Sequence, residues 1–299
     1  MKSEKSLTPK RVLIFTLLAM ALGWMVFLIV PLSGMTYGAD LTATLVIAAG
    51  MFMPTLANIL TRLITREGFH SMSLHPNFKG HGKAYLALYF WPTALIFLSG
   101  AVYYLIFPGE FDPSLPMLSQ ATASATNPVA PETAALLSAL MVVTVGPVIN
   151  IIPTLGEELG WRGYLMPKLR ELFSDRAALI ITGIIWGFWH LPVIVMGHNY
   201  GTAYVGYPYL GILQMVVFCV SLGIIEGYAS IKLNSAIPAA MIHSTVNAGA
   251  ALAVFFSKTG YNPLLGPAIT GLVGGLPLIL LAVVLFIRIG QRVEISKAV

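Results

Sequence analysis

Long apolar runs separated by short polar segments dominate the chain. A helix needs about 20 apolar residues to cross the hydrocarbon core of a bilayer. Eight runs reach roughly that length, at residues 12–33, 41–61, 84–107, 134–154, 177–196, 209–231, 236–257 and 266–287. The pattern therefore predicts an all-α polytopic membrane protein with about eight transmembrane helices, forming a single integral membrane domain over 1–299.

Composition supports this prediction. The chain is 57% hydrophobic and only 10% charged, whereas soluble domains carry about 25% charged residues. The single cysteine, Cys219, falls inside a predicted helix. One cysteine excludes an intramolecular disulfide and a cysteine-rich metal site.

The positions of the basic residues predict the orientation. Of the 17 Lys and Arg residues, 16 lie in the two tails, in 62–83, in 157–176, or at Lys232, and the other is Lys258. An eight-helix arrangement places all of these segments on one side, and basic residues favour the cytoplasmic side. We therefore expect both termini to be cytoplasmic. The compact chain, in which no targeting signal is recognised, favours a prokaryotic plasma membrane. Topology and membrane lipids account for the net charge of +5, so no nucleic-acid partner is expected.

Segment 156–176 differs from the predicted spans because apolar and basic residues alternate along it. This alternation favours a short amphipathic helix lying along the cytoplasmic interface. The preceding span contains Pro147 and Pro153, which favour a kink beside a protein-lined cavity. We expect that cavity to open to the cytoplasmic side.

Two adjacent carboxylates stand where that span turns into the amphipathic segment. On a helix, Glu158 and Arg162 are four residues apart and can pair. Glu157 is rotated by about 100° from Glu158, so its carboxylate is left free to act as a general base. An interfacial ion pair without a catalytic role explains the same spacing.

Two later helices bring further polar groups into the apolar phase. His190 ends the stretch Trp186–His190, and either a structural or a catalytic role fits it. His243 and Asn247 lie on one face of a helix and can donate to one oxygen, as an oxyanion site requires, or can join two helices. Glu226 is expected to face the bundle, in a structural, substrate-proximal or proton-relay role.

Taken together, these segments resemble a known family. The CAAX prenyl protease and bacteriocin-processing family of intramembrane endopeptidases, also called the Abi family, has three motifs in this order. Here they read Glu157-Glu158-x-x-x-Arg162, then Trp186-x-x-x-His190, then His243-x-x-x-Asn247. The resemblance covers roughly 150–250, which we interpret as the catalytic core. This chain departs from the usual pattern at Gly160-Trp161, where Leu-Phe is common, and at Trp186, where Phe is frequent.

The resemblance implies an endopeptidase without a covalent intermediate. Glu157, assisted by His190, would activate water, while His243 and Asn247 would stabilise the oxyanion. Glu158 and Arg162 would hold the first motif in shape. Glu226 is a further departure from the family pattern, and Glu226 and Trp186 are secondary candidates for the site. The implied substrate is a membrane-delivered peptide, including prenylated CAAX-type and bacteriocin-like peptides, and no cofactor is expected.

Three alternatives remain open at this point. A zinc-dependent variant would use Glu157, His190 and His243 as ligands and leave one position for water. A proton-coupled transporter would use Glu226, His190 and Glu157 as a relay. A non-catalytic immunity or binding protein would retain the same residues without cleaving anything.

Overall fold

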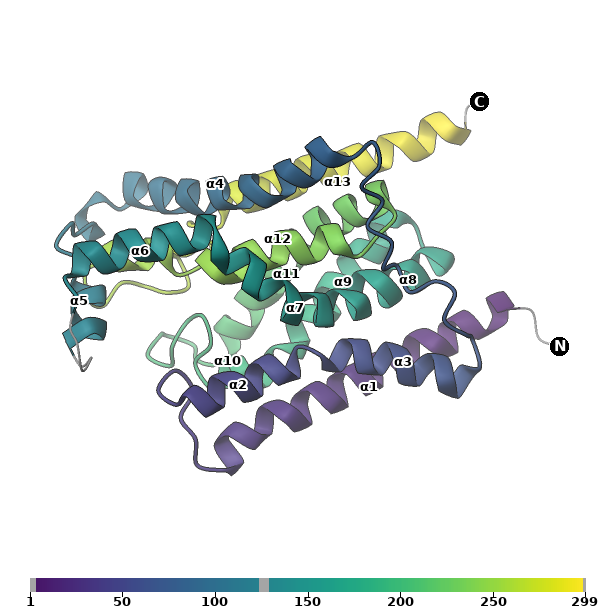
Figure 1. Ribbon diagram of the computed structural model, residues 1–299, viewed down its shortest axis with the longest axis horizontal. Helices are drawn as coiled ribbons and strands as arrows, with labels where there is room; N and C mark the ends of the chain where they lie inside the picture. The colour runs from purple at the N-terminus through teal and green to yellow at the C-terminus, as the bar shows by residue number, and fades with distance from the viewer. Residues whose placement is uncertain (1–3, 124–128, 298–299) are drawn as a thin grey trace.

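The computed structural model describes residues 4–123 and 129–297, and these residues are mainly helical (Figure 1). The first half contains α1 (Glu4–Leu32), α2 (Leu41–Gly50), α3 (Met53–Thr65), α4 (Gly82–Ile106), η1 (Pro108–Glu110), α5 (Pro116–Ala123) and α6 (Pro131–Val143). The second half contains α7 (Val145–Gly160), η2 (Trp161–Leu165), α8 (Met166–Leu172), α9 (Asp175–Trp189), α10 (Leu191–Val195), α11 (Tyr209–Leu233), α12 (Ile237–Gly249), η3 (Leu252–Phe256) and α13 (Leu276–Lys297). The predicted all-α class is confirmed.

Among the residues that the structure describes, five helical stretches are long and apolar enough to cross a membrane, as expected of an integral membrane protein. They are Leu7–Leu32, Leu41–Thr65, Gly82–Ile106, Tyr209–Leu233 and Ile237–Phe256. A sixth is obtained if Pro131–Val143 and Val145–Leu172, which are bent by 54°, form one span. The helices α9 and α13 lie where the other two spans are predicted. The count of eight stays a prediction.

The helices form three groups in Figure 1. α1, α2 and α3 lie on one side, α4 and α13 lie on the other, and α7, α9, α11 and α12 lie between them. The start of α1 and the end of α13 are at the same end of the bundle, opposite α5. The polar motifs come from the middle group, so the surrounding helices shield them.

One prediction about the segment 156–176 needs correction. Residues 156–166 are buried, and exposed side chains become frequent only beyond them. The segment is the continuation of α7 through η2, a π-helical turn, into α8. The first half is therefore a core element that carries site residues, and it is not an amphipathic helix with an exposed face.

Small residues let the core helices approach closely around this segment. A Cβ atom on Gly160 would lie 2.4 Å from the Cβ atom of Pro54 in α3. Next to this contact, the Asn58 amide donates a hydrogen bond of 2.8 Å to the carbonyl of Leu159. α3 therefore fixes the end of α7 where the two glutamates lie.

Candidate active site

Glu158 is the centre of a buried charge network. Nη1 of Arg162 donates to both carboxylate oxygens of Glu158, at 2.8 and 2.9 Å, and both side chains are fully buried. The pairing that the four-residue spacing predicts is therefore present. Such an arginine holds the carboxylate in a fixed orientation.

The partner of Glu226, which the sequence left open, is the same arginine. Nη2 of Arg162 lies 2.7 Å from Oε2 of Glu226. Neither Nη2 of Arg162 nor Oε2 of Glu226 has a hydrogen-bond partner among the described residues. The N–H bonds of Nη2 therefore do not point at Oε2. The contact is therefore an ion pair without hydrogen-bond geometry, and one guanidinium serves two carboxylates from α7 and α11.

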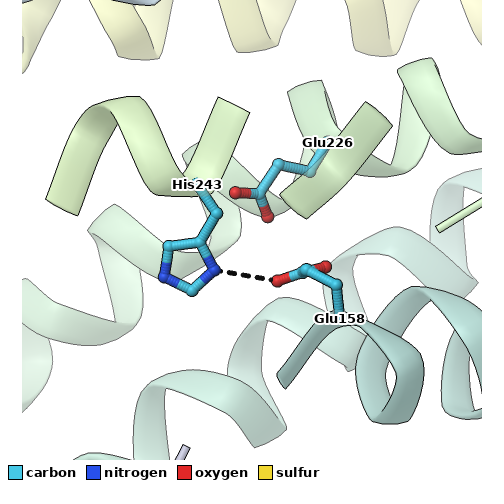
Figure 2. Close-up of side chains that lie close together, drawn as sticks. All are labelled: Glu158, Glu226 and His243. Carbon is cyan, nitrogen blue, oxygen red and sulfur yellow. Dashed lines mark hydrogen bonds and ion pairs between the residues drawn. The ribbon is translucent and has the colours of Figure 1, made fainter. Parts of the chain in front are cut away.

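His243 joins the network from α12. Figure 2 shows its ring and the Glu226 carboxylate both directed toward Glu158, with the hydrogen bond from Nδ1 of His243 to Oε1 of Glu158 dashed. The distance is 3.0 Å. An ionised carboxylate only accepts, so Nδ1 carries the proton and the other ring nitrogen, Nε2, is left for the site.

Glu157 is held differently. Its Oε2 accepts hydrogen bonds from two indole N–H groups, from Trp186 at 2.8 Å and from Trp161 at 3.3 Å. The side chain is buried, with 2% of the residue exposed. No ion pair to Glu157 is found in the described part of the chain. This carboxylate therefore differs in environment from its neighbour Glu158, as the rotation between them predicts.

His190 lies at the junction between α9 and α10. Pro192 is the second residue of α10, and proline is favoured in a first helical turn because it needs no N–H partner there. Nδ1 of His190 is 2.9 Å from the backbone carbonyl of Trp186. A carbonyl only accepts, so Nδ1 donates, and the neutral ring presents its lone pair at Nε2.

The ring of Trp186 lies between these groups. Its centroid is 5.2 Å from that of His243 and 5.8 Å from that of His190. The Arg162 guanidinium carbon is 4.4 Å from the centroid of the same ring, a cation–π contact. Trp186 therefore touches both motif histidines and the arginine while it bonds to Glu157.

Asn247 does not join this cluster. It is exposed, and its side chain makes no hydrogen bond within residues 4–123 and 129–297. It lies four residues after His243 on α12, so both start from one helix face. The proposed role of Asn247 in binding an oxyanion stays a prediction.

One histidine near the site was missed in the sequence. The ring of His198 lies parallel to that of His190, with centroids 6.4 Å apart. Its Nδ1 is 2.5 Å from the Tyr37 hydroxyl, which comes from the loop after α1. No motif spacing marks His198, because the loop after α10 brings it to the site.

Three donors lie close enough to be candidates for a metal site. One ligand atom from each of Glu158, Glu226 and His243 lies within 4.8 Å of the others. This set shares only His243 with the zinc ligands predicted from the sequence. The Arg162 guanidinium already contacts both carboxylates, so a divalent cation bound there would lie beside a positive charge.

Comparison with known proteins supports the family resemblance. Residues 132–249 match the family model described as type II CAAX prenyl endopeptidase Rce1-like. A stretch of 44 residues is 46% identical to a protein of Methanococcus maripaludis named CAAX prenyl protease 2, covering 15% of this chain and 16% of that protein. Residues 132–249, which hold every site residue predicted from the sequence, therefore resemble the Rce1-like family of CAAX prenyl endopeptidases.

Proposed function

We propose that the protein is an intramembrane endopeptidase that hydrolyses a peptide bond of a membrane-delivered, CAAX-type peptide. The observation that carries the proposal is the placement of Glu157. Its buried carboxylate is oriented by two indoles, and Trp186, one of these, also contacts both motif histidines. The family match of residues 132–249 supports the substrate class.

Glu157 and His190 are proposed to activate water. The water proton passes to the Glu157 carboxylate while the oxygen attacks the peptide carbonyl carbon, and the carbonyl π electrons move to its oxygen. Glu157 then returns the proton to the amide nitrogen as the C–N bond breaks. The free Nε2 lone pair of His190 accepts a hydrogen bond from the water and orients it.

His243 and Asn247 are proposed to stabilise the oxyanion. Glu158 accepts from Nδ1 of His243 and so holds the ring, and a ring that also carries a proton at Nε2 can donate that proton's hydrogen bond to the oxyanion. In well-studied enzymes one such donor contributes about 3–4 kcal/mol. Arg162 holds Glu158 in turn, so Glu158 and Arg162 position His243 and need not touch the substrate.

We propose that the reaction needs no bound metal. The support is electrostatic, because Arg162 supplies positive charge to Glu158 and Glu226. Cleavage should therefore persist after chelation, and the active preparation should contain far less than one zinc ion per chain by elemental analysis. Loss of cleavage on chelation, restored by zinc, would instead favour the metal-dependent variant.

The decisive experiment is mass-spectrometric detection of cleavage by the purified protein. The substrate panel contains farnesylated CAAX-type peptides, the same peptides without the lipid, and bacteriocin-leader peptides. Wild type is compared with Glu157→Gln, which keeps the size and an acceptor oxygen but removes the base. We expect a product from wild type and at least a 1,000-fold lower rate from the variant, on the order of the effect of losing a general base and its orientation.

The other outcomes are equally informative. Equal cleavage by Glu157→Gln would exclude Glu157 as the base. No product from a folded wild type would contradict the endopeptidase. Reconstituted liposomes would then test the transporter alternative by proton flux, and peptide binding without cleavage would support the non-catalytic one.

A further inference from the structure

The two hydrogen bonds to Glu157 converge on one oxygen. Trp161 lies four residues after Glu157 on the same helical stretch, and Trp186 comes from α9. Both indoles donate to Oε2, and no hydrogen bond to Oε1 is found among the described residues. The two oxygens of this carboxylate are therefore not equivalent.

This asymmetry determines which oxygen is the better proton acceptor. Each donated hydrogen bond stabilises the negative charge on the oxygen that receives it. Oε2 receives two, so the more basic lone pairs are those of Oε1. Since a rotation of the carboxylate would break both bonds, the orientation of Oε1 is fixed as well.

Neither indole can easily turn away. The Trp161 ring is fully buried and packs edge-on against Phe15 and Trp189, with centroids 5.7 and 5.9 Å away. The Trp186 ring is 1% exposed and is covered by the Arg162 guanidinium. The donors are thus rigid groups, which is the requirement for preorganising a reacting side chain.

We propose that Trp161 and Trp186 are positioning residues that clamp Oε2 of Glu157 and so present Oε1 as the proton acceptor. The catalytic part of this inference rests on the proposed function. Its geometric part can be tested without any substrate, so the two can fail separately.

The first test uses the indole ¹⁵N–¹H NMR signals of the five tryptophans, assigned by single Trp→Phe variants. Glu157→Leu removes the acceptor and keeps an apolar side chain of similar size. We expect upfield proton shifts of the Trp161 and Trp186 signals only. Trp24 and Trp189 serve as internal controls, because their indoles donate to the backbone carbonyls of Trp189 and Ala19.

The geometric part would be overturned if either expected signal stayed in place, or if all five shifted together. Glu157→Gln is the second variant, since it retains an acceptor oxygen and a polar side chain. Smaller shifts of the same two signals are expected there. Unchanged signals in both variants would show that the indoles bond elsewhere.

The second test is kinetic and uses Trp161→Phe and Trp186→Phe, which remove the N–H group and keep an aromatic ring. A hydrogen bond to a charged group contributes enough to predict a fall of kcat by about tenfold or more for each variant, with KM nearly unchanged. Trp24→Phe is the matched control and should keep both constants. A rise in KM without loss of kcat, or an equal loss in Trp24→Phe, would exclude the positioning role.

Discussion

At the residue scale, one arginine holds the polar centre together. Three carboxylates, those of Glu157, Glu158 and Glu226, lie in the same buried region, and Arg162 contacts two of them. A buried charge without its partner is strongly unfavourable, more so than a pair replaced as a whole. Loss of Arg162 is therefore expected to destabilise the fold strongly.

Arg162→Gln should destabilise the fold by about 3–5 kcal/mol, because it leaves two buried carboxylates without a cation. The measurement is unfolding of the purified protein in detergent, followed by circular dichroism. Glu226→Gln is the matched control, since the bonds between Arg162 and Glu158 remain. Glu226→Gln should lower the free energy of unfolding by clearly less than Arg162→Gln does. Similar losses in the two variants would contradict the central role of Arg162.

Sequence spacing predicted contacts within one helix but not those between helices. The pairing of Glu158 with Arg162 followed from their four-residue separation. The partner of Glu226 could not be predicted, because 64 positions separate it from Arg162 and helix packing alone brings them together. The four-residue spacing of Glu157 and Trp161 allows their contact, but nothing in the sequence indicated that Trp186 of α9 donates to the same oxygen.

At the scale of elements, close packing of α9 against α11 sets the site. A Cβ on Gly183 would lie 2.6 Å from Cα of Val220, and one on Gly187 would lie 2.6 Å from Cα of Val216. The obstacles are backbone atoms, which cannot move aside as a flexible side chain can. The two glycines therefore form a small-residue face that allows α9 to bring Trp186 and His190 to the cluster.

Gly183→Ala should force α9 and α11 apart and lower the stability by about 1–3 kcal/mol, as overpacking of a core does. Cleavage should fall with it, since Trp186 and His190 lie on the displaced helix. Thermal unfolding and peptide cleavage are measured on the same preparation. Gly82→Ala at the start of α4 is the control, because a Cβ there meets nothing within 4 Å. Equal behaviour of the two variants would refute the packing argument.

The apolar runs predicted where the helices lie, but they did not predict where a run is divided into two helices. The run 41–61 is two helices that meet at Met51 and Phe52, and the run 134–154 is divided at Thr144. Apolar content is continuous across both breaks, so composition does not reveal them. α13 begins at Leu276 and not at 266, after a segment rich in glycine and containing Pro267. Such a sequence disfavours helix in spite of its apolar character.

At the scale of the whole molecule, a second polar cluster ties three parts of the chain together at one end. Glu67, which follows α3, accepts from the Tyr164 hydroxyl at 2.8 Å and pairs with Lys168 at 2.6 Å and with Arg11 of α1 at 3.4 Å. Burial alone would raise the pKa of Glu67. The hydrogen bonds from Lys168 and Tyr164 and the charges of Lys168 and Arg11 outweigh it and lower that pKa.

This lowered pKa predicts a loss of stability in acid. The ionised Glu67 contributes its full stabilisation above the ordinary value of 4.5, and the contribution disappears as the pH falls through the lower pKa of the folded state. Unfolding temperatures between pH 3 and 7 should therefore fall less steeply in acid for Glu67→Gln than for wild type. Glu132→Gln, an exposed position on α6, should follow wild type. Parallel curves for Glu67→Gln and wild type would contradict this.

The predicted orientation can be tested with single cysteines after Cys219 is replaced by alanine. Ser114 and His75 are both exposed and lie in connections at opposite ends of the helices. With both termini cytoplasmic, a membrane-impermeant thiol reagent added to intact cells should label Ser114→Cys but not His75→Cys. Labelling should be equal after the membrane is permeabilised. The reverse pattern in intact cells would invert the topology.

The wide helical turn at Trp161–Leu165 has a consequence for how the molecule tolerates change. Glu157 and Glu158 before it, with Trp161 and Arg162 inside it, belong to the buried centre. Tyr164 and Lys168, in and after it, contact Glu67 in the second cluster. The turn sets the angular phase between these two groups, and one residue more or less rotates everything that follows by about 100°. A substitution in α7 or α8 changes one side chain and its contacts. An insertion or deletion of one residue instead turns all of α8 relative to α7. The number of residues between the buried centre and the cluster around Glu67 therefore determines whether both clusters can form.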